Sequence, residues 1–275
     1  MYECIIVGMG PAGMSAAIYA NESGLKTLIL EESTPGGLLN KVSIVNNYLG
    51  FPNISGSDLA FKMFEHIRNE NIEYKITRVL DIKDKEDYKL VTTTIGEFKT
   101  KGIILSTGRK LKKSGIPNED KFINKGISYC AICDGYLFKN KNVVVLGNNQ
   151  TAESEANYLS KICNVKRITE QKVIEFIGNE YLEGIKLEDG NVVKCDAAFV
   201  YYGYMSSTSF IKNYDITDEK GYVIVDKNMK SKCNMIYACG DIVKKDLYQV
   251  STAVSEGAIA AISLSKEIKE IWLFV

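Results

Sequence analysis

A glycine-rich hexapeptide near the start of the chain, Gly8 to Gly13, constrains the fold more than any other feature. The apolar residues 3–7 before it predict a buried parallel strand, and residues 14–20 after it predict a helix. A second strand is expected over residues 26–30, closed by Glu31. Strand, glycine turn, helix, strand and acid in this order form the pattern of a dinucleotide-binding unit. The alternative is a glycine turn that binds no ligand.

Each position in this motif has a physical role. Gly8 allows a tight turn, Gly10 lets the backbone approach a pyrophosphate, and Gly13 lets the helix pack on the strand. Glu31 lies where a carboxylate can accept a ribose hydroxyl. The sequence therefore predicts a dinucleotide site at the N-terminal end of the first helix.

The chain between this unit and residue 108 contains loops, one helix and further strands. Glycines at 36 and 37 and asparagines at 46 and 47 are suited to contact a ligand, and Ser57 is expected to cap a helix that runs to Asn71. The alternating segments 73–80, 88–94 and 97–105 predict an antiparallel meander. It ends at the small residues Ser106, Thr107 and Gly108.

A pair of cysteines, Cys130 and Cys133, is followed at once by Asp134. Such a pair closes a small disulfide ring or provides half of a metal site, and both need thiolates. A zinc site normally takes four ligands, but the other five cysteines are scattered and His66 is the only histidine. A redox disulfide is therefore favoured over a metal, with Asp134 able to exchange protons. Two buried, unreactive cysteines are the remaining alternative.

A second strand–turn–helix pattern occupies residues 141–161, but its glycine motif is broken. Asn149 stands at the place of the second glycine, where its side chain would crowd a pyrophosphate. The next strand, 165–168, leads into Thr169-Glu170-Gln171, whose acid would repel a 2′-phosphate. No crossover helix fits before the hairpin around residue 190. A weakened or absent nucleotide site is expected, and the alternative is that Asn149 is tolerated.

The last part of the chain is expected to return to the first domain near Gly203. Gly240 and Asp241 follow a short strand, and Gln249 to Ala253 open a final helix. Composition is that of an ordinary globular protein, with 45% hydrophobic and 25% charged residues among 275. A net charge of zero gives no general attraction to nucleic acid or membrane. No signal-peptide pattern or membrane-spanning segment is recognised, and seven mostly scattered cysteines favour a reducing cytoplasm.

Taken together, these motifs resemble the low-molecular-weight thioredoxin reductases, which are FAD flavoproteins, over nearly the whole chain. The resemblance implies an α/β fold of two Rossmann-like, three-layer ββα domains, the second inserted in the first and reduced in size. The FAD-binding domain would comprise residues 1–109 and 203–275, and the central redox-disulfide domain residues 110–202. A homodimer is also implied.

The same resemblance implies roles for individual residues. Cys133 would face the flavin, Cys130 would attack thioredoxin, and Asp134 would act as acid and base. The residues that would bind FAD are Gly8, Gly10, Pro11, Ala12, Gly13, Glu31, Gly37, Leu38, Asn47, Thr107, Gly108, Gly240, Asp241, Gln249, Val250 and Ala253.

The chain departs from NADPH-dependent members of the family at Asn149, at residues 169–171 and in its short central domain. Leu38 and Tyr248 also replace a polar residue and an arginine. This pattern is similar to that of the ferredoxin-dependent flavin thioredoxin reductases, so reduced ferredoxin is the expected electron donor. The segment from Lys99 to Lys141 contains ten basic and three acidic residues. Such a run can steer an acidic partner or simply form a solvated surface. NADPH as donor, and a flavin redox sensor without turnover, are the alternatives.

Overall fold

The computed structural model describes residues 1–42, 44–129, 131–206 and 208–272. The chain divides into two compact units, Met1–Lys110 with Ser206–Val275, and Leu111–Met205. The sequence analysis placed the two crossings at 109/110 and 202/203, within three residues of these points. Strands β7 (Arg109–Leu111) and β15 (Tyr204–Ser206) lie on the two connecting segments and pair with each other.

The first unit is built on a parallel sheet. Strand β1 lies in its middle, because β1 pairs in parallel with β2 on one side and with β6 on the other. The strands, in their order across the sheet, are β3 (Glu73–Ile76), β2 (Thr27–Glu31), β1 (Tyr2–Val7), β6 (Gly96–Leu105) and β16 (Ile236–Ala238).

Strand β6 belongs to two layers. Its first half pairs antiparallel with β5 (Lys89–Thr93), which pairs with β4 (Val79–Asp84), and its second half joins the parallel sheet. The predicted meander is therefore wrong for the start of segment 73–80, which forms β3 beside β2. The chain changes partner at Thr77, whose N–H donates to the Glu31 carbonyl oxygen at 2.7 Å. Alternation alone does not distinguish a parallel edge strand from a meander strand.

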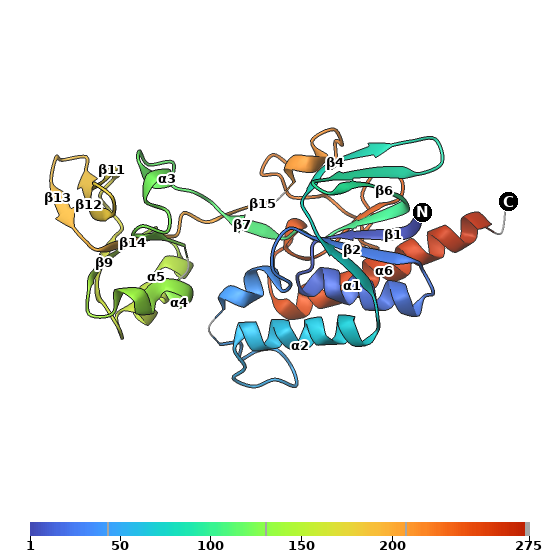
Figure 1. Ribbon diagram of the computed structural model, residues 1–275, viewed down its shortest axis with the longest axis horizontal. Coiled ribbons are helices and arrows are strands. Elements are labelled where there is room, and N and C mark those ends of the chain that lie inside the picture. The colour runs from blue at the N-terminus through green and yellow to red at the C-terminus, as the bar shows by residue number, and fades with distance from the viewer. Residues whose placement is uncertain (43, 130, 207, 273–275) are drawn as a thin grey trace. The chain divides into compact units, whose positions relative to one another are not determined.

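Three helices cover one face of the parallel sheet, and the meander lies on its other side (Figure 1). They are α1 (Pro11–Glu22), α2 (Gly56–Asn69) and α6 (Val250–Trp272), and the unit also has the 3-10 helices η1 (Gly37–Lys41), η3 (Ser209–Ile211) and η4 (Gly240–Ile242). Helix α2 is capped by Ser55, whose Oγ accepts the Asp58 N–H at 3.0 Å, and not by Ser57 as predicted.

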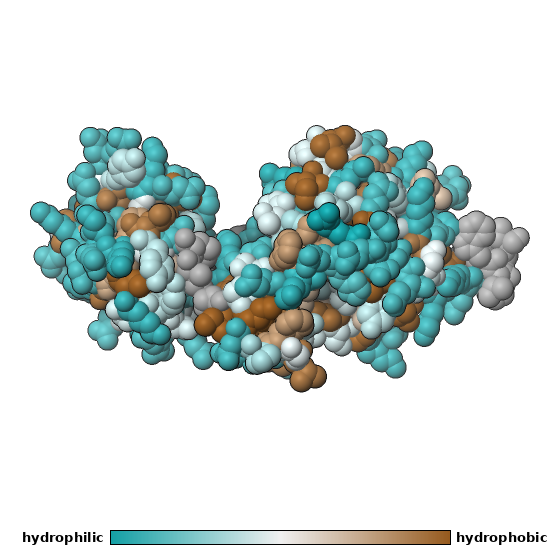
Figure 2. Space-filling view, turned by 60° about the horizontal axis from the view of Figure 1, so that its bottom comes forward, coloured by the Kyte–Doolittle hydropathy of each residue, from teal (hydrophilic) through white to brown (hydrophobic). Residues whose placement is uncertain are grey.

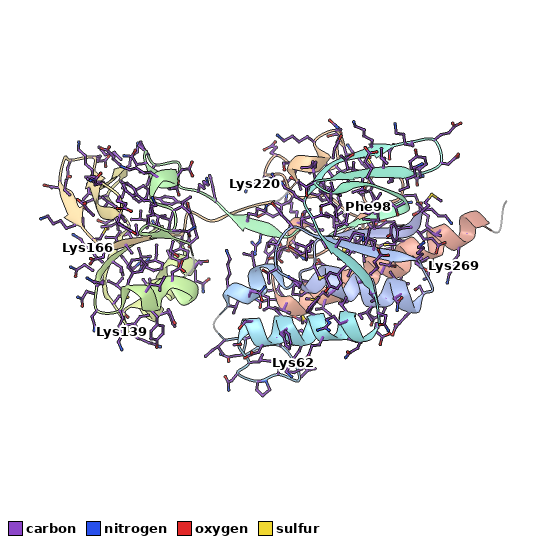
Figure 3. All side chains as sticks on the ribbon, in the orientation of Figure 1. Lys62, Phe98, Lys139, Lys166, Lys220 and Lys269 are labelled. Carbon is purple, nitrogen blue, oxygen red and sulfur yellow. The ribbon has the colours of Figure 1, made fainter. Side chains whose placement is uncertain are left out.

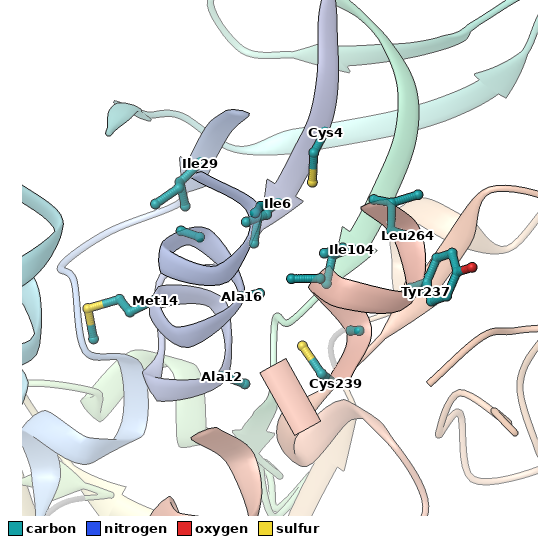
Figure 4. Packing of buried hydrophobic residues seen from close by; sticks show 14 of the residues in the cluster. Cys4, Ile6, Ala12, Met14, Ala16, Ile29, Ile104, Tyr237, Cys239 and Leu264 are labelled. Atoms are coloured by element: carbon teal, nitrogen blue, oxygen red, sulfur yellow. The ribbon is translucent and has the colours of Figure 1, made fainter. Parts of the chain in front are cut away.

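The side chains of β1 alternate between two cores. Cys4 and Ile6 pack with α1 and α6 (Figure 4), whereas Ile5 and Val7 pack on the meander side. Full burial of such a side chain stabilises a fold by about 1.5–3 kcal/mol. Helices α1 and α6 approach closely because Gly257 has no Cβ, and one built there would lie 2.2 Å from the Ala12 carbonyl oxygen.

The second unit repeats this layering on a smaller parallel sheet. Its strands, in order, are β10 (Asn164–Ile168), β9 (Asn142–Leu146), β14 (Ala197–Val200) and β8 (Ile127–Ser128). Val143 and Val145 of β9 pack toward helix α5, while Val144 and Leu146 pack toward an antiparallel layer. That layer consists of β11 (Val173–Gly178), β12 (Leu182–Leu187) and β13 (Val192–Lys194).

The helices of the second unit are short. They are α3 (Glu119–Phe122), α4 (Ala131–Asp134), η2 (Gly135–Phe138) and α5 (Gln150–Leu159). Between β10 and β14 the described chain passes only through β11, β12 and β13, so the crossover helix that the sequence excluded is absent there. The predicted fold class, two Rossmann-like ββα units with the second inserted and smaller, is confirmed.

Among the helices of the described residues, none combines the length and the apolar character needed to cross a bilayer. The face shown in Figure 2 is largely hydrophilic, and its apolar patches are small and separate. Most large apolar side chains of both units lie instead in the cores around the two sheets.

Candidate functional site

The first glycine loop joins the end of β1 to the start of α1. A Cβ on Gly8, where φ is +104°, would lie 2.6 Å from the Ser106 carbonyl oxygen, and one on Gly13 would lie 2.0 Å from the Gly8 carbonyl oxygen. Both positions therefore require glycine for packing. Gly10 differs, because a Cβ there would meet nothing within 4 Å. The loop is open at the one position where a ligand has to approach the backbone.

The start of α1 is left uncapped by side chains. Gly10 is its N-cap, no side chain makes a cap hydrogen bond, and Pro11 occupies the first turn. The free N–H groups and the dipole of such a helix start favour an anion. This 12-residue helix and the open Gly10 together fit a bound phosphate group.

Glu31, at the end of β2, is buried and directed back at the loop. Its Oε2 accepts the Met9 N–H at 2.7 Å, and its Oε1 accepts the Ser33 N–H at 2.9 Å. The carboxylate holds the turn in place by charge-assisted hydrogen bonds. It also brings an acidic group beside the loop, as the motif predicted.

Segments distant in sequence converge on this loop. The Gly36 N–H donates to the Met9 carbonyl oxygen at 2.7 Å, and a Cβ on Gly37 would lie 3.8 Å from Gly10 Cα. A Cβ on Gly240 would lie 2.7 Å from Ala12 Cβ. Ser106, which precedes Thr107 and Gly108, donates from Oγ to the Val7 and Gly8 carbonyl oxygens at 3.0 Å.

A second group of predicted residues lies near the start of α6. Asn47 donates from Nδ2 to Gln249 Oε1 at 2.9 Å, across 202 positions of sequence. Val250 packs with the cluster that contains Tyr48, and Ala253 is buried in the helix core. Leu38 lies half-buried in η1.

Arg109 is a functional candidate that the sequence analysis missed. Its guanidinium donates to Asp241 Oδ2 from Nε at 3.2 Å and from a terminal nitrogen at 2.8 Å, and it lies 4.0 Å from the centre of the Tyr248 ring. Lys245 approaches the same ring at 5.7 Å and pairs with Glu256, which accepts the Gly240 N–H at 2.8 Å. Two cations thus hold the Gly240-Asp241 turn. The aromatic residue Tyr248 was the available sequence signal, because aromatic rings attract cations such as Arg109 and Lys245.

The redox-motif segment of the second unit is described in part. Cys130 lies outside the described residues, and Cys133 lies on α4 with its side chain outside them. Asp134 Oδ2 accepts a hydrogen bond from Ser128 Oγ at 2.6 Å. The Ala131 N–H donates to Tyr201 Oη at 2.9 Å. The structure thus places Asp134 at the end of α4, held by the strand that precedes the cysteines.

Two further side chains accompany this segment. Tyr201 Oη donates to Glu155 Oε2 at 3.4 Å. Burial raises the pKa of Glu155 above the ordinary glutamate value, an effect opposed by its hydrogen bonds to Tyr201 and to the Ala131 N–H. Neither residue was predicted, because both are joined to the cysteine segment only by folding.

Four of the remaining five cysteines are unsuited to redox chemistry. Cys4, Cys163, Cys195, Cys233 and Cys239 are free thiols. Burial raises the pKa of Cys195 to about 12, and it also raises the pKa values of Cys4, Cys163 and Cys239. A thiol that stays protonated is a poor nucleophile. Within the described residues, no three His, Cys, Asp or Glu side chains are placed to hold a metal ion.

The second glycine loop, between β9 and α5, is closed by its own side chain. Asn149 is the N-cap of α5, where its Oδ1 accepts the Ala152 N–H at 3.0 Å and its Nδ2 donates to the Tyr201 carbonyl oxygen at 2.7 Å. Gly147 still needs glycine, since a Cβ there would lie 2.3 Å from that carbonyl oxygen. The cap satisfies one N–H that a phosphate would otherwise bind.

The turn after β10, residues 169–172, contains the acid Glu170 and the cation Lys172 but no arginine. Thr169 and Glu170 are exposed, and the neighbouring Arg167, on β10, pairs with Glu153 of α5 at 4.0 Å. An exposed carboxylate at this turn opposes a 2′-phosphate, as the sequence predicted.

The basic run from Lys99 to Lys141 is divided between the two units. Its first four members belong to the first unit and the others to the second. Lys101, Arg109, Lys110, Lys113 and Lys141 make ion pairs. Lys139, labelled in Figure 3, is exposed at the surface of the second unit. Solvated side chains account for most of this run.

Comparison with known proteins places this fold in a class. The model of the pyridine nucleotide-disulphide oxidoreductase family matches residues 2–169 and 149–257. The thioredoxin reductase of Ureaplasma parvum is 37% identical over 294 residues, covering 95% of both chains. That alignment is longer than the 275-residue chain, so the relative has residues with no counterpart here.

Solved structures agree with this class. A thioredoxin reductase from Lactococcus lactis superposes with a TM-score of 0.91 at 33% identity, covering 98% of this chain and 100% of that one. A ferredoxin-flavin thioredoxin reductase from Clostridium acetobutylicum superposes with a TM-score of 0.61 at 30% identity, covering 98% of each chain. The chain belongs to the thioredoxin reductase family.

Proposed function

We propose that this protein is a flavin-dependent disulfide reductase that holds FAD at the first glycine loop and reduces thioredoxin through Cys130 and Cys133. The observation that carries the proposal is the open, uncapped start of α1, on which Gly36, Gly240 and the acid Glu31 converge. A dinucleotide pyrophosphate fits the start of α1, because the backbone is accessible at Gly10 and the helix start favours an anion.

The proposed FAD contacts fall into three groups. The loop would hold the pyrophosphate, Glu31 would bind the adenosine ribose, and Asp241 would bind the polyol chain that joins pyrophosphate to flavin. Asn47 and Gln249 would bind close to the flavin. The remaining proposed contacts are Pro11, Ala12, Gly37, Leu38, Thr107, Gly108, Gly240, Val250 and Ala253.

Bound FAD supplies the electrons that reduce the cysteine pair. The Cys130 thiolate attacks the disulfide of thioredoxin, forming a mixed disulfide and releasing one thioredoxin thiolate. The Cys133 thiolate then attacks Cys130 Sγ, releasing the second thiolate and closing the Cys130–Cys133 disulfide. Asp134, held by Ser128, takes up and returns the protons that these steps move.

An apolar pair beside this segment is proposed as the contact for thioredoxin. Tyr136 and Leu137, on η2 directly after Asp134, are 64% and 76% exposed. Adjacent exposed apolar side chains are typical of protein interaction surfaces. Their place two and three residues beyond the acid puts a docking surface next to the reactive thiols.

We propose reduced ferredoxin as the electron donor. The support is the self-capped loop at Asn149 together with the acid Glu170 in the turn after β10, because both weaken the start of α5 as an anion site. NADPH is the second candidate, because the matching family model is named for pyridine nucleotide-disulphide oxidoreductases. A cytoplasmic homodimer is proposed from the family resemblance, and analytical ultracentrifugation measures the assembly.

The reductase activity is tested without any protein donor. The full chain is photoreduced under argon with EDTA, and oxidised thioredoxin is then added. The flavin should reoxidise as four thioredoxin thiols appear per flavin, two with the electrons of the reduced flavin and two with those of the Cys130–Cys133 dithiol. Cys133→Ser should leave the flavin reduced, and Cys130→Ser should form no mixed disulfide with thioredoxin.

Cys233→Ser is the matched control, because Cys233 is a free and partly accessible thiol away from the motif. It should behave as the wild type. Thioredoxin reduction that persists in both motif variants would refute the assignment of the cysteine pair.

A further inference from the structure

Tyr201 connects two features of the second unit that are far apart in sequence. It follows β14 directly and is only 3% exposed. Its carbonyl oxygen accepts the Asn149 side-chain N–H at 2.7 Å, and its Oη accepts the Ala131 N–H at 2.9 Å. The same hydroxyl donates to Glu155 at 3.4 Å.

The partners of Tyr201 come from both features. Asn149 is the residue that closes the altered glycine loop, and Glu155 lies on the helix that this loop begins. Ala131 is the first residue of α4 and stands between the two cysteines. One residue therefore ties the altered loop, through its carbonyl oxygen, to the backbone between the two cysteines, through its hydroxyl.

Further contacts fix α4 and η2 against α5. A Cβ on Gly135 would lie 2.9 Å from Leu159 Cδ2 and 3.1 Å from Ile162 Cδ1, so this glycine allows a close approach. At the other end, Asp134 is bonded to Ser128. The cysteine segment is thus held at Ala131, at Asp134 and along its contact with α5.

We propose that Asn149, Tyr201 and Glu155 form a positioning brace for the Cys130–Cys133 segment, so that the second glycine loop supports the redox centre in place of a nucleotide. The inference rests on the proposed function only in taking this cysteine pair as redox-active. None of the three side chains is a catalytic residue, since each acts through the Ala131 backbone.

The brace should shift the equilibrium between the Cys130–Cys133 disulfide and its dithiol form in one direction. Closing a disulfide ring costs the conformational entropy of the open dithiol segment. A segment already held at Ala131 has less of that entropy to lose, so the brace favours the disulfide. Releasing the brace frees the dithiol form more than the closed ring and makes the pair easier to reduce.

The test compares Tyr201→Phe with Tyr202→Phe in the full chain. Each change removes one hydroxyl, but Tyr202 is 41% exposed and makes no bond to the cysteine segment that the structure shows. The protein is equilibrated in buffers of reduced and oxidised glutathione and then alkylated. Mass spectrometry of the peptide that contains both cysteines gives the fraction of dithiol. The dithiol forms here as glutathione disulfide is produced from two glutathione thiols.

Tyr201→Phe should shift this equilibrium about tenfold toward the dithiol, which corresponds to about 30 mV. Tyr202→Phe should leave it unchanged. Equal constants in Tyr201→Phe and wild type, or the same shift in both variants, would overturn the brace. A wild type that forms no Cys130–Cys133 disulfide would instead refute the redox assignment on which the brace depends.

Hydrogen exchange at the Ala131 amide gives a second, independent readout. Its N–H donates to Tyr201 Oη and also to Glu155, so Tyr201→Phe should speed exchange several-fold. Asn149→Gly keeps every group that contacts Ala131 and should speed exchange less, through the loosened Tyr201 backbone. An unchanged Ala131 rate in Asn149→Gly would remove the altered loop from the brace.

Discussion

The two glycine loops of this protein share one architecture and differ most clearly at the N-cap of the helix that follows. In each, a parallel strand ends at a glycine with positive φ, a turn follows, and a helix packs back on the sheet. The first helix has Gly10 as its N-cap and presents its N–H groups uncovered. The second has Asn149, which covers an N–H with its own Oδ1. The N-cap side chain is therefore one determinant of whether the helix start is open to an anion.

The acids that follow the two loops differ in the same way. Glu31 is buried and accepts backbone N–H groups of the first loop, so its charge is used to hold the site. Glu170 is exposed after β10 and has no such role in the described structure. The lesson is that a nucleotide site is maintained by several groups together, and the second unit has lost more than one of them.

The largest expected effect comes from giving the first helix the N-cap residue of the second. Gly10→Asn should lower FAD affinity about 100-fold, because the new side chain caps α1 and covers the pyrophosphate position. The fold should survive, since a Cβ at Gly10 meets nothing within 4 Å. Flavin content per chain and FAD titration of the apoprotein measure the effect.

Gly24→Asn is its matched control, because a Cβ at Gly24 also meets nothing and asparagine tolerates its φ of +75°. This variant should keep its flavin. Full flavin content in Gly10→Asn would show that the first loop does not hold the cofactor as proposed.

Breaking the Arg109–Asp241 ion pair tests whether this cation holds Asp241 for FAD binding in the first unit. Arg109→Met leaves Asp241 without the partner at 2.8 Å and should weaken FAD binding roughly tenfold, with a loss of about 2 kcal/mol in unfolding free energy. The two groups are 17% and 24% exposed, so solvent compensates only in part.

Urea unfolding and FAD titration measure these two quantities. Lys110→Met is the neighbouring control, because Lys110 pairs with Glu32 at an exposed site and surface pairs contribute little. Equal losses in the two variants would show that the buried pair has no special role.

The cap of the second helix gives a smaller effect. Asn149→Gly removes the bonds to Ala152 and to the Tyr201 carbonyl oxygen and should cost about 1 kcal/mol in unfolding free energy. Asn148→Gly, at the exposed preceding position, should cost less. The loop variant should gain no rapid reduction by NADPH, because Glu170 remains. Rapid NADPH reduction in Asn149→Gly would show that Asn149 alone closes the nucleotide site.

The smallest effect concerns Glu155 and depends on pH. Its pKa is raised in the folded state, so the folded protein binds a proton more tightly than the unfolded chain. The unfolding free energy therefore falls as pH rises from the ordinary glutamate pKa of 4.5 through the raised value. Glu155→Gln should remove this fall. Thermal unfolding of variant and wild type should diverge with increasing pH and agree in slope below 4.5, and parallel profiles throughout would contradict it.

The sequence was sufficient for the features that depend on neighbouring residues. The glycine loop, Glu31 and the parallel strands follow local patterns of period and spacing, and the structure has them where they were expected. The start of segment 73–80 was assigned to the wrong partner because edge pairing is decided by tertiary contacts. The Ser57 cap was wrong because Ser55 also fits the rule, and only the backbone geometry selects between them.

The groups that the sequence did not reveal are those joined over long separations. Arg109 and Asp241 are 132 positions apart, and Tyr201 and Ala131 are 70 apart. The effect of Asn149 was expected to be crowding of a pyrophosphate. In the structure its side chain caps α5 and holds Tyr201, a second role that depends on the position of β14.

The central claim is that the first loop binds the working cofactor and the second binds no reducing nucleotide. Anaerobic bleaching of the visible flavin band tests it most directly, with NADPH in one cuvette and reduced ferredoxin in another, each against its reductant alone. The account predicts rapid bleaching by ferredoxin and none by NADPH. Rapid bleaching by NADPH would contradict it and show that α5 still accepts a nucleotide despite Asn149.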